Sequence, residues 1–111
     1  VQQFLYELLG TPFYLKYRVQ VKFIPQTAQW VISEKTLDRG NVKANSVYGT
    51  SRINAYHIIE ETLNLRDVRI NDYVEDANGN KKPVLNKKET AIAQGKQDQI
   101  KRAFEEWIWI Q

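Results

Sequence analysis

The sequence contains no cysteine and only one histidine, His57, in 111 residues. Without thiols the chain forms neither a disulfide nor a thiolate metal site, and with one histidine a multi-histidine metal site is excluded as well. No apolar run approaches the roughly 18 residues that a membrane helix needs. The first ten residues, VQQFLYELLG, lack the basic start and cleavage site of a signal peptide. We therefore expect a cytoplasmic protein with no membrane partner.

The composition predicts one globular domain. Hydrophobic residues make up 42% and aromatic residues 12% of the chain, which is too apolar for a disordered segment. A length of 111 residues allows a modest core. The chain does not begin with Met and ends in the apolar stretch FEEWIWIQ without a helix stop signal. We expect residues 1–111 to be a single domain excised from a larger protein.

The net charge of +3 conceals an uneven distribution of charged residues. Residues 35–52 carry four basic side chains against Asp38, and residues 53–80 carry two arginines against six carboxylates. Residues 81–102 then carry seven basic side chains against two carboxylates. Segregated charge of this kind fits a nucleic-acid partner or electrostatic docking between domains, and equally a solvated surface.

The acidic stretch DYVEDANGNKKPVL, residues 72–85, has oxygen-bearing side chains at alternate positions, as a calcium loop does. Counted from Asp76, however, its glycine falls at the fourth position rather than the sixth, and the twelfth position is Lys87 rather than a glutamate. Asn78-Gly79 between extended apolar runs instead predicts a hairpin closed by a type I′ turn. We interpret the stretch as structural, with no metal bound.

The hydrophobic pattern predicts a helix and a hairpin in the first part of the chain. QFLYELLG, residues 3–10, has the apolar stripe of a short helix that ends at Gly10. Alternation over residues 15–23 predicts a strand with a basic outer face, and QWVISEK predicts its return strand, giving a hairpin of residues 14–34. Residues 36–51 are rich in small polar residues and predict a mobile surface loop.

A helical period returns at residues 51–65, with Thr50 or Ser51 as the expected cap. The hairpin around Asn78-Gly79 follows, and residues 89–109 form the longest predicted helix. The order α-ββ-α-ββ-α indicates an α+β fold with helices packed on antiparallel sheet and both hairpins in one core. Trp109 lies on a different side of the last helix from Trp107 and would need a partner. The side chains expected in the core are Tyr17, Val19, Val21, Trp30, Ile59, Leu63, Ile70, Ile100, Phe104 and Trp107.

No pattern in the sequence assembles a catalytic site. Glu60 and Glu61 are adjacent and point about 100° apart on a helix, so they cannot share a proton. His57 can pair with either glutamate, but no nucleophile or cleft is indicated beside it. Neither phosphate-loop pattern, G-x-x-x-x-G-K-[ST] or G-x-G-x-x-G, occurs. VYGTSR, residues 47–52, comes nearest because a glycine leads into a helix N-terminus there, and ordinary capping also explains it.

Basic and aromatic side chains give a candidate DNA-binding surface. Its residues are Lys16, Arg18, Lys22, Lys43, Tyr48 and Arg52. The first three would form a row on the outer face of the first strand, about 6–7 Å apart, since alternate residues advance about twice 3.3 Å. Lys43 and Arg52 would extend that row if the loop of residues 35–50 folds over the same face, and Tyr48 sits with Arg52 on the loop that enters the middle helix. Rings and cations on one face are typical of surfaces that bind single strands, although lysines on an edge strand also protect against aggregation.

Three stretches carry a resemblance to a known family: FLYELLGTPFYL, VKFIPQTAQWVISEKTLDRGNVKANSVYGTSRINAYHIIEETLNLRDVRI and NKKETAIAQGKQDQIKRAFEEWIW. Together they resemble a segment of very large proteins encoded by conjugative elements and phages. Those proteins look like fusions of an N6-adenine DNA methyltransferase with an SNF2-type helicase, similar in plan to phage antirestriction proteins. The resemblance covers nearly the whole chain and implies a place between the methyltransferase and helicase parts.

The resemblance carries no catalytic residue over to this chain. An N6-adenine methyltransferase has Asn or Asp before Pro-Pro and an aromatic residue, whereas Pro12, Pro25 and Pro83 stand singly here. The Walker lysine and the acidic Mg²⁺ motif of an SNF2 motor are also missing. The resemblance therefore implies a noncatalytic accessory domain without a cofactor, with S-adenosylmethionine and ATP with Mg²⁺ bound elsewhere in the parent protein. The implied partners are DNA, contacted weakly through its backbone, and the flanking methyltransferase and helicase domains. The alternative is a structural connector that docks these two parts without touching DNA.

Overall fold

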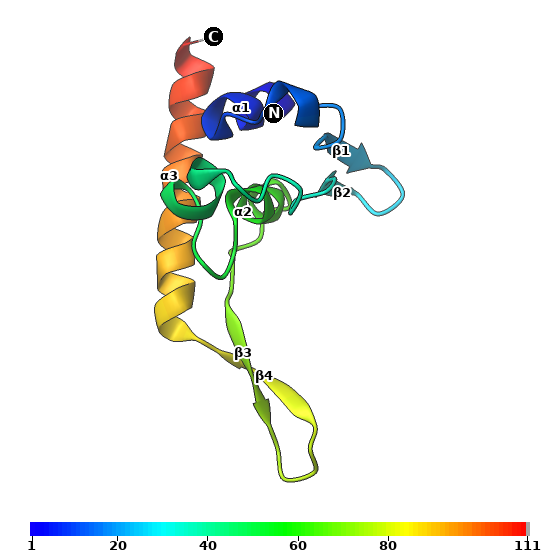
Figure 1. Cartoon of the computed structure of the whole chain (residues 1–111), viewed down its shortest axis with the longest axis vertical. Coiled ribbons are helices and arrows are strands. Elements are labelled where there is room, and N and C mark those ends of the chain that lie inside the picture. The colour runs from blue at the N-terminus through cyan, green and yellow to red at the C-terminus, as the bar shows by residue number, and fades with distance from the viewer. Residues whose placement is uncertain (111) are drawn as a thin grey trace.

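The computed structural model describes residues 1–110, and Figure 1 shows its longest helix running along the long axis of a molecule that measures 54 × 30 × 28 Å. The elements are α1 (Gln2–Leu9), η1 (Phe13–Leu15), β1 (Val21–Ile24), β2 (Gln29–Ile32), η2 (Lys43–Val47), α2 (Ala55–Leu63), β3 (Asn71–Glu75), β4 (Lys81–Leu85) and α3 (Lys87–Ile110). β1 pairs with β2 and β3 with β4, both antiparallel. The predicted α+β class and the order α-ββ-α-ββ-α are confirmed.

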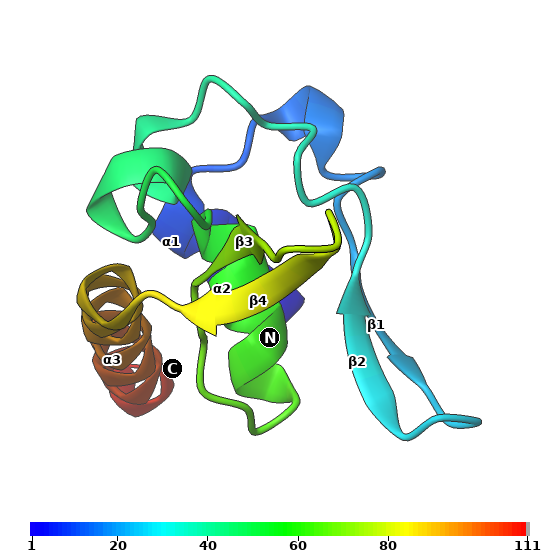
Figure 2. The same ribbon diagram turned by 90° about the horizontal axis from the view of Figure 1, so that it is seen from below.

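The core lies where the three α-helices meet, with α2 between α3 and the first hairpin (Figure 1, Figure 2). Leu5 of α1 and Ile58 of α2 are fully buried, and Phe4 packs edge-on against the ring of Phe104 in α3 at 4.9 Å. Burying one such side chain contributes about 1.5–3 kcal/mol. Among the ten expected core residues, four are buried, namely Val19, Ile59, Ile70 and Ile100. Five are partly buried, namely Val21, Trp30, Leu63, Phe104 and Trp107.

Polar side chains of α3 hold the extended segment of residues 66–70. Gln97 is buried, accepts a hydrogen bond from the Val68 N–H (3.1 Å), and donates to the Arg66 carbonyl oxygen (2.9 Å). Thr90 accepts from the Ile70 N–H at 2.9 Å, and Gln94 donates to the Val68 carbonyl oxygen at 3.1 Å. These three side chains recur at helical spacing, so they form one face of α3. That face supplies the hydrogen-bond partners that a neighbouring strand would otherwise give to residues 66–70.

α2 binds the free edge of β2 in the same way. The Asn64 side chain accepts from the Trp30 N–H (2.7 Å) and donates to the Trp30 carbonyl oxygen (2.9 Å). Glu60 accepts from the Ile32 N–H at 2.8 Å and from Lys35 Nζ at 2.9 Å. Burial favours a raised pKa for Glu60, but these two bonds outweigh it and the pKa lies below its ordinary value. An edge that would otherwise need another strand is thus satisfied by helix side chains.

The first strand is shorter than predicted because residues 13–18 form η1 and a turn instead. The Tyr6 hydroxyl on α1 lies 2.7 Å from the carbonyl oxygens of both Lys16 and Val19, which satisfies groups that a strand would have paired. Val19 is buried and Arg18 is exposed, as the alternation predicts. The turn and the predicted strand both direct Val19 inward and Arg18 outward. Tyr17, however, is 71% exposed, so its predicted burial is wrong.

Residues 38–47 lie largely at the surface, as predicted, and several of their side chains attach the segment to the core. Ala44 in η2 is fully buried. Asn41 donates to the Leu9 carbonyl oxygen and to Asp38, both at 2.7 Å, and accepts from the Ala44 N–H at 3.1 Å. Asp38 also accepts from the hydroxyl of buried Tyr56 at 2.9 Å, and burial is the main cause that raises the pKa of Tyr56. This network joins the segment to α1 and α2.

Asparagines begin both later helices. The Asn54 side chain accepts from the His57 N–H at 3.0 Å, so α2 starts at Ala55 and neither Thr50 nor Ser51 is its cap. Asn86 accepts from the Glu89 N–H at 3.0 Å, so α3 starts at Lys87, two residues before the prediction. An asparagine side chain satisfies an N–H that has no partner within the helix, and this stabilises the helix by about 1 kcal/mol.

The second hairpin forms as predicted but lies outside the core. It projects as a ribbon from the helices (Figure 1), and every residue of β3 and β4 is exposed. The Asp76 N–H donates to the Asn80 carbonyl oxygen, so the loop between them has three residues. Gly79 in this loop has a positive φ of 79°. Asn78 does not adopt a positive φ, so the turn is not the expected type I′. The Asp76 carboxylate instead accepts from the N–H groups of Asn78 and Asn80, each at 2.9 Å.

We predict that Gln97→Leu lowers the free energy of unfolding by about 2–4 kcal/mol, because each buried group left without a partner costs about 1–3 kcal/mol. Gln99→Leu is the matched control, since Gln99 is exposed on the same helix. Urea unfolding of the two variants measures the difference. Equal stabilities would show that the polar face of α3 does not hold residues 66–70.

Candidate functional site

The first three candidate DNA-binding residues do not form a row. Lys16 places its Nζ 5.3 Å from the centre of the Tyr6 ring, and Arg18 binds both carboxylate oxygens of Glu34, at 2.5 and 2.9 Å. The hydrogen bond and charge of Glu34 raise the pKa of Arg18. Because β1 begins only at Val21, the predicted spacing of 6–7 Å between alternate strand residues does not apply to Lys16 and Arg18. Lys22 is exposed and forms no ion pair within residues 1–110.

The other three candidates lie on the far side of α2. The Lys96 Nζ of α3 donates to the Val47 carbonyl oxygen at 3.1 Å, which places η2 beside α3. Both views show η2 and β1 on opposite sides of α2 (Figure 1, Figure 2). Lys43, Tyr48 and Arg52 therefore do not extend a row that starts on β1. Lys43 is exposed and Tyr48 is partly buried.

Arg52 is engaged by the base of the ribbon. It donates to the Asn71 carbonyl oxygen at 3.0 Å and to the Asp72 carboxylate at 2.9 Å. Asn86 also donates to Asp72, at 2.9 Å. The bonds from Arg52 and Asn86 together lower the pKa of Asp72. Of the five basic candidates for DNA contact, two, Arg18 and Arg52, are thus paired with carboxylates.

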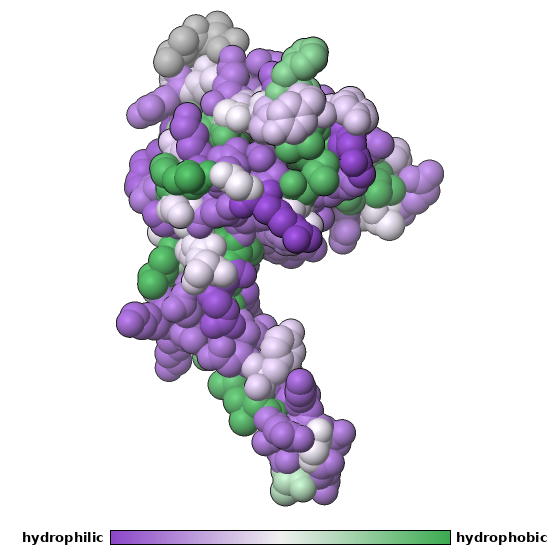
Figure 3. Space-filling view, in the orientation of Figure 1, coloured by the Kyte–Doolittle hydropathy of each residue, from purple (hydrophilic) through white to green (hydrophobic). Residues whose placement is uncertain are grey.

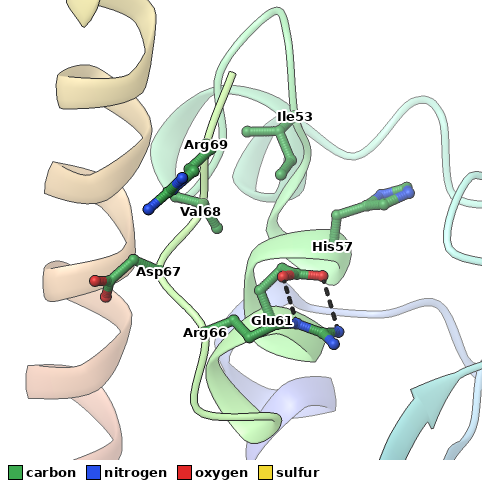
Figure 4. Close-up of a pocket in the computed structure, with 7 residues that line it drawn as sticks. All are labelled: Ile53, His57, Glu61, Arg66, Asp67, Val68 and Arg69. Carbon is green, nitrogen blue, oxygen red and sulfur yellow. Dashed lines mark hydrogen bonds and ion pairs between the residues drawn. The ribbon is translucent and has the colours of Figure 1, made fainter. Parts of the chain in front are cut away.

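A hollow of about 550 Å³ opens between α2 and residues 66–69, and His57 is one of its lining residues (Figure 4). The His57 ring points away from Glu61, which binds Arg66 at 2.9 and 3.2 Å. His57 Nδ1 instead lies 3.0 Å from the Asn54 amide oxygen. Burial and the charge of Lys35 lower the pKa of His57. The carboxylates that the sequence offered as partners, Glu60 and Glu61, are therefore held by other residues.

Two further features of the described residues bear on function. Across residues 1–110, no three His, Asp or Glu side chains come together as a metal ion would require. Nor does any helix in this part of the chain combine the length and the apolar character needed to cross a bilayer.

Apolar side chains are exposed at both ends of the long axis. On the ribbon, Val74 and Val84 lie on one face and both are about half exposed, and Figure 3 shows apolar surface on this arm. At the other end of α3, Ile108 is exposed and Trp109 is 89% exposed. Trp109, which the sequence places on a different side of the last helix from Trp107, is thus largely open to solvent within residues 1–110. Patches of this kind mark contact surfaces when they are contiguous.

The stretch VYGTSR is a tight connection between η2 and α2. A Cβ atom on Gly49 would lie 2.2 Å from the Ala44 carbonyl oxygen and 3.1 Å from the Ala55 nitrogen. Thr50 Oγ1 accepts from the N–H groups of Arg52 and Ile53, at 3.0 and 3.2 Å. The glycine is required by packing.

Sequence reasoning missed Arg69 and Tyr73, which line a second hollow beside this connection. The sequence did contain a signal for Arg69, because it stands between the apolar residues Val68 and Ile70. Both of these are buried, and in an extended segment the residue between them points outward.

We predict that Gly49→Ala lowers the free energy of unfolding by about 1–3 kcal/mol, because backbone atoms must move to admit the methyl group. Gly40→Ala is the control, since a Cβ atom there meets nothing within 4 Å. Thermal or urea unfolding distinguishes the two. Similar stabilities would contradict the close packing of η2 on the start of α2.

Comparison with known proteins gives one match. No curated protein and no solved structure matches the chain. A family model described as a domain of unknown function matches residues 1–111, the whole length of the chain. The chain therefore belongs to the family of domains of unknown function DUF8437.

Proposed function

We propose that this chain is a noncatalytic connector that docks the methyltransferase and helicase parts of a larger DNA-modifying protein of a mobile element. The parent protein and its parts come from the sequence resemblance. The observation that supports docking is the presence of exposed apolar side chains on the ribbon and at the C-terminal end of α3, which lie at opposite ends of the molecule (Figure 1).

The geometry of α3 suits a spacer. Its 24 residues extend about 36 Å at 1.5 Å per residue, and the ribbon continues from its first turn. Residues 66–70 are bonded to α3 by Thr90, Gln94 and Gln97, so the base of the ribbon is fixed to the helix. Two surfaces held at a fixed distance can position two neighbouring domains.

The ribbon itself needs support from a partner. A two-stranded ribbon is marginally stable alone in water, and here both of its faces are open to solvent. Val74 and Val84 are diagonal neighbours on one face, because Val74 pairs with Lys82 and Val84 with Asp72. Covering this face buries apolar area and stabilises the ribbon at about 25 cal/mol per Å².

Contact with the DNA backbone is the second candidate function. The observation in its favour is that Lys22 and Lys43 are exposed and form no ion pair within the described residues. Their positions on opposite sides of α2 do not make one continuous basic surface (Figure 2). Phosphate contacts at such separated points give weak binding that falls steeply with salt.

A photocrosslinking amino acid at Val74 or at Trp109 of the full-length protein tests the connector. We expect each position to crosslink to a different flanking part of the same chain. Tyr14 is the control position, because it is 70% exposed on η1 and lies at neither end of α3.

Two results would contradict docking. One is crosslinking at Val74 and Trp109 that does not exceed the yield at Tyr14. The other is crosslinking from these positions to added duplex DNA in preference to protein, which would support the second candidate.

A further inference from the structure

The second hollow, of about 490 Å³, lies between the connection at residues 50–54 and residues 69–73, and none of its lining residues is acidic. Its lining includes Ser51, Arg52, His57, Arg69 and Tyr73. The volume falls within the range of about 300–1,000 Å³ typical of ligand sites. The hollow offers hydroxyl, guanidinium and amide donors and no carboxylate. Such surroundings favour the binding of an anion.

Arg69 supplies the positive charge of this hollow. It is exposed and forms no ion pair with any carboxylate in the part of the chain described by the structure. Arg52 bonds to Asp72 and Asn71 through Nη2, so its other N–H groups remain for a ligand. Asp72 is close but does not line the hollow.

The hollow is open and continues into its neighbour. Ile53, His57 and Arg69 line both this hollow and the one of about 550 Å³ shown in Figure 4, so the two adjoin, and together they are called the groove. Glu61 and Asp67 line only the neighbouring part, where Glu61 is bound by Arg66. Two adjoining open hollows suit a chain of linked units better than an enclosed small molecule.

Tyr73 adds an exposed ring to the cations. It is 68% exposed on β3, on the ribbon face opposite to that of Val74 and Val84. Grooves that bind single strands combine cations for the phosphates with aromatic rings on which unpaired bases stack. The docking face and the Tyr73 face of the ribbon are therefore separate.

We propose that this groove binds a segment of single-stranded nucleic acid. A phosphate lies at Arg69 and the free side of Arg52, and the adjoining base stacks on Tyr73. A duplex does not satisfy the site, because its bases are already stacked and paired. The proposal stands independently of the connector function, since it uses neither Trp109 nor the Val74 face.

The test is fluorescence anisotropy of a labelled short oligothymidylate titrated with the 111-residue chain at several salt concentrations. Arg69→Gln should reduce the slope of log affinity against log salt by about 0.7, the value for one phosphate contact on a single strand. Tyr73→Ala should weaken binding by about tenfold, since one stacked base contributes at that level. Circular dichroism checks that each variant is folded.

The matched controls are Arg102→Gln and Tyr14→Ala, which remove an exposed arginine and an exposed tyrosine outside the groove. Both should bind like the unchanged chain. The proposal would be overturned if the control variants lost as much affinity as Arg69→Gln and Tyr73→Ala. It would also be overturned if the unchanged chain did not bind the oligothymidylate at low salt. The assignment to a single strand would be overturned if duplex DNA bound as tightly as the oligothymidylate. The same holds if free thymidine monophosphate bound as tightly.

Discussion

The buried amide of Gln97 is the contact on which the arrangement of the second half of the molecule depends. It reaches from α3 to residues 66–70 and also donates to the Thr62 hydroxyl of α2 at 3.0 Å. Glu60 of α2 and Asn64, the residue that caps the end of α2, do the same for β2. Each sheet is only two strands wide, so backbone groups at its edges need other partners. Polar side chains at the C-terminal end of α2 provide them for β2, and side chains of α3 provide them for the segment that leads into β3.

This arrangement explains which parts of the fold were predictable from the sequence. α1, the second hairpin and α3 have local signals: Gly10 after an apolar stripe, Asn78-Gly79 between extended runs, and a long helical period. Their existence was predicted. The start of α3 was missed by two residues and the start of α2 by four, because the asparagine caps at Asn86 and Asn54 had not been recognised.

The rest could not be read locally, because it depends on contacts between distant residues. The turn at residues 13–18 is fixed by Tyr6, and the packing of η2 is fixed by Asn41 binding the Leu9 carbonyl oxygen. An alternating pattern does not reveal either contact. The carboxylate partners of two candidate residues were missed for the same reason: Arg18 and Arg52 were placed correctly at the surface, but Glu34 and Asp72 bind them. Arg69 and Tyr73 meet Arg52 only after the chain has folded around α2.

The two proposals share one structural basis. Fixing residues 66–70 to α3 holds the ribbon in the position that the proposed docking requires, and it also places Arg69 and Tyr73 beside the connection that carries Arg52. Loss of that attachment would release both surfaces together. Rigid attachment of an exposed ribbon is therefore the central claim about this molecule.

Hydrogen exchange of individual backbone amides tests that claim most directly. The Val68 and Ile70 N–H groups donate only to side chains of α3, whereas the alternation of the β3–β4 ladder turns the Tyr73 N–H outward. The account predicts that the Val68 and Ile70 amides are protected as strongly as those in the middle of α2, while the Tyr73 amide exchanges rapidly. Exchange of Val68 and Ile70 as rapid as that of Tyr73 would contradict it.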